Sequence, residues 1–224
     1  GVGETDNTVI GANAMGSMDE GSGQVDQNIA IGVNALIGTD IGGASTAIVD
    51  NIAIGTQAMD SGSIGAQTGT IAIGAQALGV LTTGTGNVAI GFESLDACTT
   101  GVSNTMVGYQ TGSALPAGGD GNTAVGYQAL LAGHHDNTHE NTCIGYQAGA
   151  QISTGFNNTY IGANVDGNNG SFSNVTAIGN NFEATQDDTV FLGNNDTEEV
   201  WMALDKGATV HCDMVRSTTM PAFL

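Results

Sequence analysis

Residues 122–130 read NTAVGYQAL and residues 141–149 read NTCIGYQAG, two closely similar nonapeptides that begin 19 residues apart. Each opens with the five-residue unit Asn-x-x-(Ile/Val)-Gly, in which β-branched residues alternate with a small one. Alternation with a period of two is typical of a β-strand. The nonapeptides therefore predict a short strand that ends in a glycine bend.

The five-residue unit recurs eleven times between residues 7 and 193, with degenerate copies at 175–179 and 189–193. From Gly74 to Gly179 its terminal glycines are 17 to 19 residues apart. This period is too short for helical-pair repeats and suits one coil of a β-solenoid. We therefore predict an all-β fold, a parallel β-roll or solenoid of about eleven coils.

Three positions of the unit should form ladders along such a stack. The opening asparagine suits a corner and can bond its neighbours, the apolar residue belongs to a strand, and the glycine allows a tight bend. The predicted ladders consist of Asn7, Asn28, Asn51, Asn87, Asn104, Asn122, Asn141 and Asn158; Ile10, Ile31, Ile54, Ile73, Ile90, Val107, Val125, Ile144, Ile161, Ile178 and Leu192; and Gly11, Gly32, Gly55, Gly74, Gly91, Gly108, Gly126, Gly145, Gly162, Gly179 and Gly193.

A second half-unit follows each glycine, as in VNAL at 33–36 and AQAL at 75–78. We expect it to form a second short strand, with the Asn or Gln in another polar ladder. The middle residue of the first unit is usually Ala, which suggests that something packs closely on that face. A coil this thin buries little apolar surface against the entropy cost of ordering its backbone. Apolar residues on both strand faces therefore favour an oligomer, and three-fold symmetry is the natural closed arrangement for a fibre.

The charge of the chain excludes several classes of partner. It contains 22 Asp and Glu but only Lys206 and Arg216, a net charge of −20. Without basic residues it cannot neutralise a phosphate backbone, so we expect no nucleic-acid binding. No apolar run approaches the ~20 residues that span a bilayer, so we expect no membrane insertion. Cys98, Cys143 and Cys212 have no CxxC spacing and are expected to be small buried side chains.

The repeat resembles the head repeat of trimeric autotransporter adhesins, a left-handed parallel β-roll. The longer form in NTAVGYQAL and NTCIGYQAG is even more similar to bacteriophage tail fibres. The resemblance covers about residues 7–193 and departs from the adhesin pattern in longer loops such as 37–50 and 59–69. It implies a homotrimer of parallel chains, intertwined or side by side, and transfers no catalytic residue.

The period ends after Gly193, which predicts two parts, a β-roll at 1–193 and neck or capping strands at 194–224. Residues 198–215 alternate like strands around Lys206 and Gly207 and contain the single Trp. The final TTMPAFL, residues 218–224, resembles the entry into the C-terminal knob of phage fibres. That resemblance implies a knob beyond this chain.

Three groups of residues raise the question of chemistry. His134, His135 and His139 lie in one seven-residue segment with acidic neighbours, a composition that transition metals bind, although a solvated loop between two coils is the simpler explanation. Loop aspartates suit at most weakly bound cations, and we expect no cofactor. In four successive coils the residue directly after the repeat glycine is aromatic: Phe92, Tyr109, Tyr127 and Tyr146. Such a stripe suits packing or glycan stacking.

Catalysis is not expected. Asp187–Asp188, Glu198–Glu199 and Glu93 do not by themselves make the paired-carboxylate geometry of a glycosidase, because adjacent strand residues point to opposite faces.

The sequence thus favours a non-enzymatic segment of a homotrimeric phage fibre in the virion, which positions a receptor-binding tip. Its expected partners are its own copies, other fibre or virion proteins and a host-surface receptor. The alternative is the head of a trimeric adhesin on a bacterial cell surface that binds host or other cells directly. A monomeric solenoid that binds ice or calcium is a third class, disfavoured because Thr8, Thr105 and Thr123 align beside apolar positions rather than in paired Thr rows.

Overall fold

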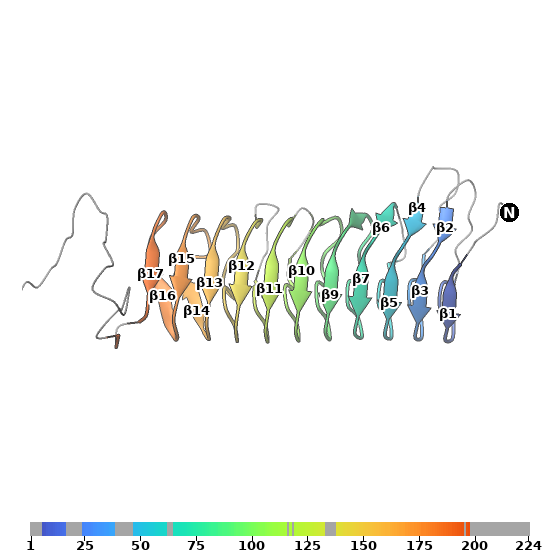
Figure 1. The fold of residues 1–224 in the computed structure, drawn as a ribbon, viewed down its shortest axis with the longest axis horizontal. Helices are drawn as coiled ribbons and strands as arrows, with labels where there is room; N and C mark the ends of the chain where they lie inside the picture. Colours follow the sequence, from blue (N-terminus) through green and yellow to red (C-terminus); the bar gives the residue numbers. More distant parts are fainter. Residues whose placement is uncertain are drawn as a thin grey trace, which may run out of the picture.

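The computed structural model describes residues 6–16, 24–38, 47–61, 65–115, 117, 119–132, 138–194 and 196–197. Within these residues the chain is all-β, has no helix and winds into a parallel β-solenoid whose strands follow one another along the long axis (Figure 1). The expected neck at 194–224 lies almost entirely outside the described residues, as do Lys206 and the single Trp. Nothing in the described part is a helix long and apolar enough to cross a membrane.

The largest sheet has eleven parallel strands, one from each copy of the five-residue unit. Its strands, in spatial order, are β1 (Thr8–Ile10), β3 (Ile29–Ile31), β5 (Ile52–Ile54), β7 (Ile71–Ile73), β9 (Val88–Ile90), β10 (Thr105–Val107), β11 (Thr123–Val125), β12 (Thr142–Ile144), β13 (Thr159–Ile161), β15 (Thr176–Ile178) and β17 (Val190–Leu192). Equivalent residues pair across the whole sheet, as Ala124 does with Cys143.

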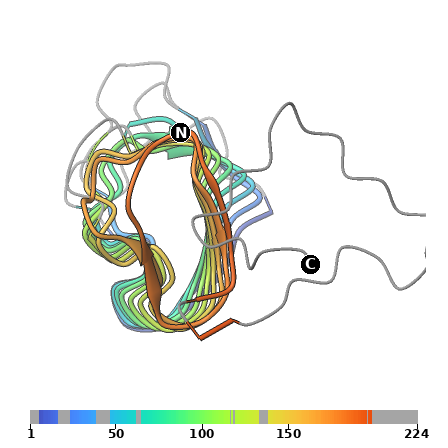
Figure 2. The same ribbon diagram turned by 90° about the vertical axis from the view of Figure 1, so that its left-hand side faces the viewer.

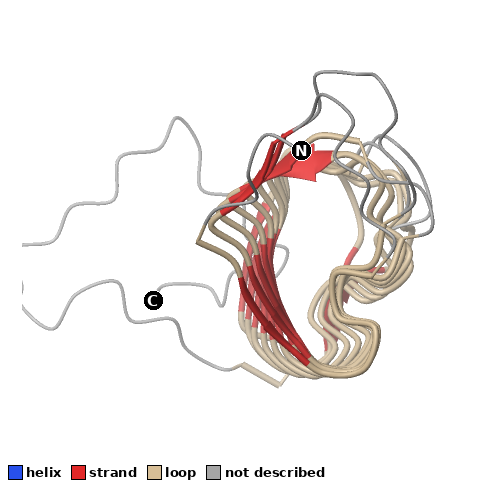
Figure 3. Ribbon diagram, turned by 90° about the vertical axis from the view of Figure 1, so that its right-hand side faces the viewer, coloured by secondary structure: helices blue, strands red, loops and turns tan. Residues whose placement is uncertain are grey.

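Two smaller parallel sheets form parts of the other walls, and turns and loops form the rest. One joins β2 (Gln24–Asp26), β4 (Ala47–Val49), β6 (Gln67–Thr68) and β8 (Gly84–Thr85), and the other joins β14 (Val165–Gly167) and β16 (Phe182–Ala184). The end-on views in Figures 2 and 3 show a closed outline that bends inward on the side away from the eleven-stranded sheet. The wall that faces away from the eleven-stranded sheet is therefore indented.

The strands of the large sheet place their middle residue inside the solenoid and the flanking residues outside. Ala89 and Ala124 are completely buried, whereas Ile90 and Val125 are more than one third exposed. The small middle residue therefore faces the core, and the residues that pack near it come from the same chain. Leu and Met residues of the following turn, such as Leu95 and Leu130, belong to the same buried cluster.

The repeat glycines are required by both conformation and space. Gly91 has φ +138°, and a Cβ there would overlap the carbonyl oxygen of Gly108 in the next coil. Any side chain at this position would be strained and would also push neighbouring coils apart.

The second half-unit is a turn in most coils, so the expectation of a second strand there is wrong. Its Asn or Gln and the Leu or Met two residues later both have left-handed backbone, as Gln128 and Leu130 do with φ +52° each. Two left-handed residues in one short segment cannot continue an extended strand. Only the last of these segments, β14 and β16, are strands.

A buried asparagine ladder fixes the corner before the large sheet. The Oδ1 atom of Asn104 accepts hydrogen bonds from the backbone N and the Nδ2 of Asn122, at 2.9 and 3.2 Å, and Asn122 bonds Asn141 in the same way. Each Nδ2 also donates to a loop carbonyl, as from Asn104 to Gly119 O at 2.6 Å. Every polar atom of these side chains is used, which is what a polar ladder inside a core requires.

Candidate functional site

The histidines expected as metal ligands are placed only in part. His134 and His135 lie outside the described residues. His139 stacks on Phe156, with ring centroids 5.2 Å apart, and its Nδ1 lies 3.8 Å from a carboxylate oxygen of Glu140. No group of three or more His, Cys, Asp or Glu that could hold a metal ion occurs among the residues that the structure describes.

The aromatic residues form one continuous stack along the solenoid. Phe92, Tyr109, Tyr127 and Tyr146 stand in successive coils, with centroids 5.2 to 5.3 Å apart and planes within 15° of parallel. Each ring is 40 to 50% exposed. Because the ring faces cover one another, the stack presents mainly its edges outward, and a sugar could reach a ring face only at its two ends.

The acidic residues singled out in the sequence serve mostly as structural acceptors. Asp187 accepts the backbone N–H of Ser173 at 2.7 Å, and Asp188 accepts the side chain of Asn174 at 2.9 Å. Glu93 accepts the amide of Gln110 at 2.6 Å. Glu198 and Glu199 lie outside the described residues.

The two described cysteines, Cys98 and Cys143, are buried free thiols. Burial raises the pKa of Cys98 to about 11 and raises that of Cys143 further, so both remain protonated thiols at neutral pH.

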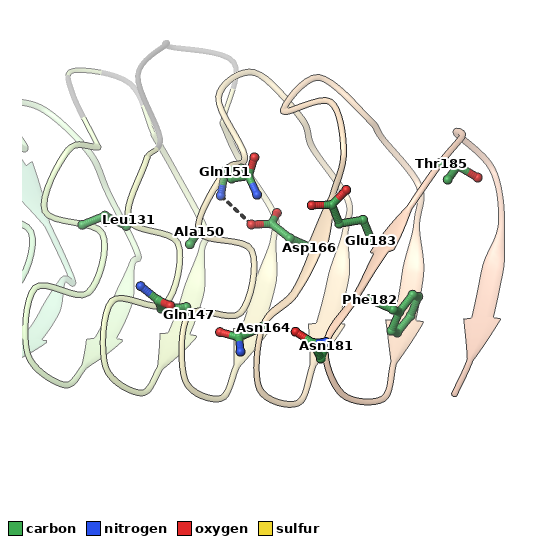
Figure 4. A pocket seen from close by; sticks show the side chains of 10 residues that line it. All are labelled: Leu131, Gln147, Ala150, Gln151, Asn164, Asp166, Asn181, Phe182, Glu183 and Thr185. Atoms are coloured by element: carbon green, nitrogen blue, oxygen red, sulfur yellow. Dashed lines mark hydrogen bonds between the residues drawn. The ribbon is translucent and has the colours of Figure 1, made fainter. Parts of the chain in front are cut away.

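One candidate site is a pocket of about 760 Å³ near the C-terminal end of the described solenoid. Figure 4 shows two rows of polar side chains around it, with Gln147, Asn164 and Asn181 in one row and Gln151, Asp166 and Glu183 in the other. Its lining consists of Leu131, Gln147, Ala150, Gln151, Asn164, Asp166, Asn181, Phe182, Glu183 and Thr185. A smaller pocket of about 280 Å³ lies several coils away and is lined by Gln57, Asp60, Gln76, Gly79, Val80 and Asp96.

The amides of the large pocket belong to a row that runs along the solenoid. This amide row contains the residue two positions after each repeat glycine, and its members have φ between +51° and +59°. It consists of Asn13, Asn34, Gln57, Gln76, Glu93, Gln110, Gln128, Gln147, Asn164 and Asn181. The left-handed turn thus aims one long polar side chain per coil to the same side.

The carboxylates come from the paired strands β14 and β16, whose register places Asp166 beside Glu183. Asp166 is only 5% exposed, and its two oxygens accept the backbone N–H groups of Gln151 at 2.7 Å and Gly167 at 2.8 Å. Burial, together with the Glu183 charge, raises the pKa of Asp166 to about 6. Glu183 is exposed.

Sequence reasoning missed this pair. A signal was present, because the segment ANVDG at 163–167 replaces the small and apolar residues of earlier coils with a carboxylate. An acidic residue at a position that is elsewhere buried marks a departure from the repeat.

Comparison with known proteins yields no match for this chain among protein-family models, curated proteins or solved structures.

Proposed function

We propose that this chain is a non-enzymatic structural segment of a homotrimeric fibre, whose coils give stiffness and position a receptor-binding tip. The observation that carries this proposal is the outer face of the eleven-stranded sheet. This outer face bears two rows of Thr, Val, Ile or Leu and no charged residue over its whole length. Contiguous exposed apolar faces of this kind are typical of interaction sites.

A second copy of the same chain is the partner that fits best. The rows repeat at the strand spacing of ~4.8 Å, so a partner with the same period can match them coil by coil. The chain is otherwise strongly acidic, with a net charge of −20, and two copies repel unless they approach through an uncharged surface. Three such faces around one axis close the assembly without leaving an apolar face exposed.

The absolute mass of the chain, measured by light scattering in ~0.5 M NaCl, tests this proposal. We expect three times 22.4 kDa for the natural chain. Ile144→Glu, on the outer face and 39% exposed, should give a folded monomer, because it places charges against one another in the interface. Val33→Glu, 48% exposed on the turn side, is the matched control and should remain trimeric. A monomeric natural chain, or a trimeric Ile144→Glu variant, would contradict the proposal.

The virion is the location we propose, because NTAVGYQAL and NTCIGYQAG resemble phage fibre repeats more than adhesin heads. The adhesin head on a bacterial surface is the alternative. Mass spectrometry of purified virions and of cell-surface fractions separates the two, since the chain would be found in only one of them.

A further inference from the structure

The large pocket is elongated along the solenoid axis. Its lining begins at Leu131 and ends at Thr185, so it spans several successive coils, and Figure 4 shows these residues spread along the axis. Its volume of about 760 Å³ falls within the ~300–1,000 Å³ of typical ligand sites. Its length and openness suit a linear molecule better than a compact one.

The amide row is hydrogen-bonded from Gln110 to Gln147 but not beyond, at Asn164 and Asn181 in the pocket. Gln110 donates to Glu93, Gln128 donates to Gln110 at 2.9 Å, and Gln147 donates to Gln128 at 2.9 Å. The chain of hydrogen bonds stops there. In the described part of the molecule, the side chains of Asn164 and Asn181 make no hydrogen bond, and nothing donates to Oε1 of Gln147.

The opposite row supplies acceptors. Glu183 extends its exposed carboxylate from β16 toward the coil that holds Asp166 (Figure 4). Carboxylates accept from hydroxyl groups, and a primary amide both donates and accepts. Phe182, Leu131 and Ala150 add apolar surface to the lining of the pocket. Donors, acceptors and apolar patches at short intervals match the alternating hydroxyl and C–H surface of a sugar chain.

Charge narrows the ligand class. The sequence has no Lys or Arg before residue 206, so no cationic side chain of the described residues can offset the carboxylates at the pocket. An anionic polysaccharide would be repelled. We propose that the pocket between the amide row and the β14–β16 carboxylates binds a neutral oligosaccharide laid along the solenoid axis. This site lies on a different wall from the outer face of the large sheet, so it does not depend on the proposed trimer.

The test is titration of the full chain with neutral hexasaccharides, followed by saturation-transfer NMR and calorimetry. The probes are α- and β-linked glucose, β-linked mannose and β-linked N-acetylglucosamine hexamers, with a galacturonate hexamer as the anionic comparison. We expect at least one neutral hexamer to bind with a Kd of about 1 mM, and the galacturonate hexamer not to bind. Asn181→Ala and Glu183→Gln should each weaken binding about fivefold or more, because the first removes a hydrogen-bonding side chain and the second replaces a charged acceptor of two oxygens by a neutral amide with one.

Asn34→Ala is the matched control, since it removes an asparagine of similar φ from the same row far from the pocket. It should leave the Kd unchanged, while thermal unfolding verifies that all three variants are folded. Failure of every neutral hexamer to bind at 10 mM would overturn the proposal. So would binding that Asn181→Ala and Glu183→Gln leave intact, or a response to Ca²⁺ alone with none to any sugar.

Discussion

In the core of this solenoid, a large side chain at one position of a coil is paired with a small residue at a second position of the same coil. The middle residue of β3, β5, β7, β9 and β11 is Ala, and the residue six positions later is Leu or Met, as in Ala89 with Leu95. Where the strand carries Met106, the later residue is Gly112, and a Cβ on Gly112 would lie 3.1 Å from the Met106 sulfur. Cys143 and Gly149 form a second exchange of this kind. These coils therefore fill one interior space from either of two positions.

Because the two residues fill the same space, substitutions at Met106 and Gly112 should have strongly non-additive effects on the free energy of unfolding. Met106→Ala should leave a cavity and lower the free energy of unfolding by about 2–4 kcal/mol. Gly112→Leu should overpack the same space and cost about 1–3 kcal/mol. The double variant recreates the pairing of Ala124 with Leu130 and should be more stable than either single variant in urea unfolding. Additive losses would contradict the exchange.

The reverse substitutions at Ala124 and Leu130, to Met and Gly, provide the control. They transplant the exchanged arrangement into a neighbouring coil and should show coupling of the same sign.

Burial of Asp166 predicts a pH dependence of stability. The pKa of Asp166 is raised from 3.8 in the unfolded chain to about 6 in the fold, with Glu183 as the charged group beside it. The folded state therefore binds the proton more tightly, and this stabilisation is complete below pH 3.8 and is lost as the pH rises through about 6.

The comparison with Asp166→Asn isolates this effect. The melting temperature of the natural chain relative to the variant should fall between pH 4.5 and pH 7.5, because only the natural chain acquires a buried charge. A difference that is constant across this range would show that Asp166 does not titrate as a buried group.

At the scale of the element, the strands of the large sheet and the asparagine ladder could be predicted from the sequence. Both depend on residue types that recur at one position, and stacking of equivalent residues follows directly from the repeat. The turn after each glycine could not be predicted, because segments such as VNAL and YQAL are as compatible with a strand as with a turn when taken in isolation. The segment is a turn because Gln128 and Leu130 both have left-handed backbone, and in this turn the Leu130 side chain is buried in the core.

Little of the candidate pocket could be predicted from the sequence. The amides were recognised as a ladder, but nothing in their spacing indicated that the hydrogen-bonded row ends at Gln147. The Asp166–Glu183 pair depends on the register of β14 and β16, which begins where the repeat is least regular.

One element carries a break that can be repaired. Thr70 occupies the ladder position between Asn51 and Asn87, and its buried Oγ1 has no hydrogen-bond partner in the described residues. Thr70→Asn should continue the ladder by accepting from Asn87 and donating to Asn51. We expect it to raise the free energy of unfolding by about 1 kcal/mol in urea unfolding.

Asn104→Thr is the converse experiment, since it introduces the same break in an intact part of the ladder. It should destabilise the chain by at least as much as Thr70→Asn stabilises it. If Thr70→Asn is neutral or destabilising, continuity of the ladder contributes nothing at this corner.

At the scale of the whole molecule, charge is the dominant feature. The chain carries a net charge of −20, and self-repulsion of this size weakens a compact state unless salt screens it. Assembly of three copies would concentrate the repulsion further. The fold therefore suits surroundings of high ionic strength.

Thermal unfolding measured at a series of salt concentrations tests whether screening of the charge stabilises the fold. The melting temperature should rise from low salt to ~0.5 M NaCl, where the screening length falls below ~5 Å. KCl at the same ionic strength should give the same curve, because screening depends on ionic strength and not on a bound ion. A flat or falling melting temperature would contradict the prediction.

The absence of Lys and Arg from the solenoid also determines where digestive proteases can cleave the chain. Trypsin and related proteases cut after Lys or Arg, and this chain offers them only Lys206 and Arg216. Everything that the structure describes lies before the first of these bonds. Such a protease could shorten the chain at its C-terminal end, but it would leave the eleven-stranded sheet in one piece even if the coils opened, so the rod withstands this class of enzyme through its composition as well as its fold.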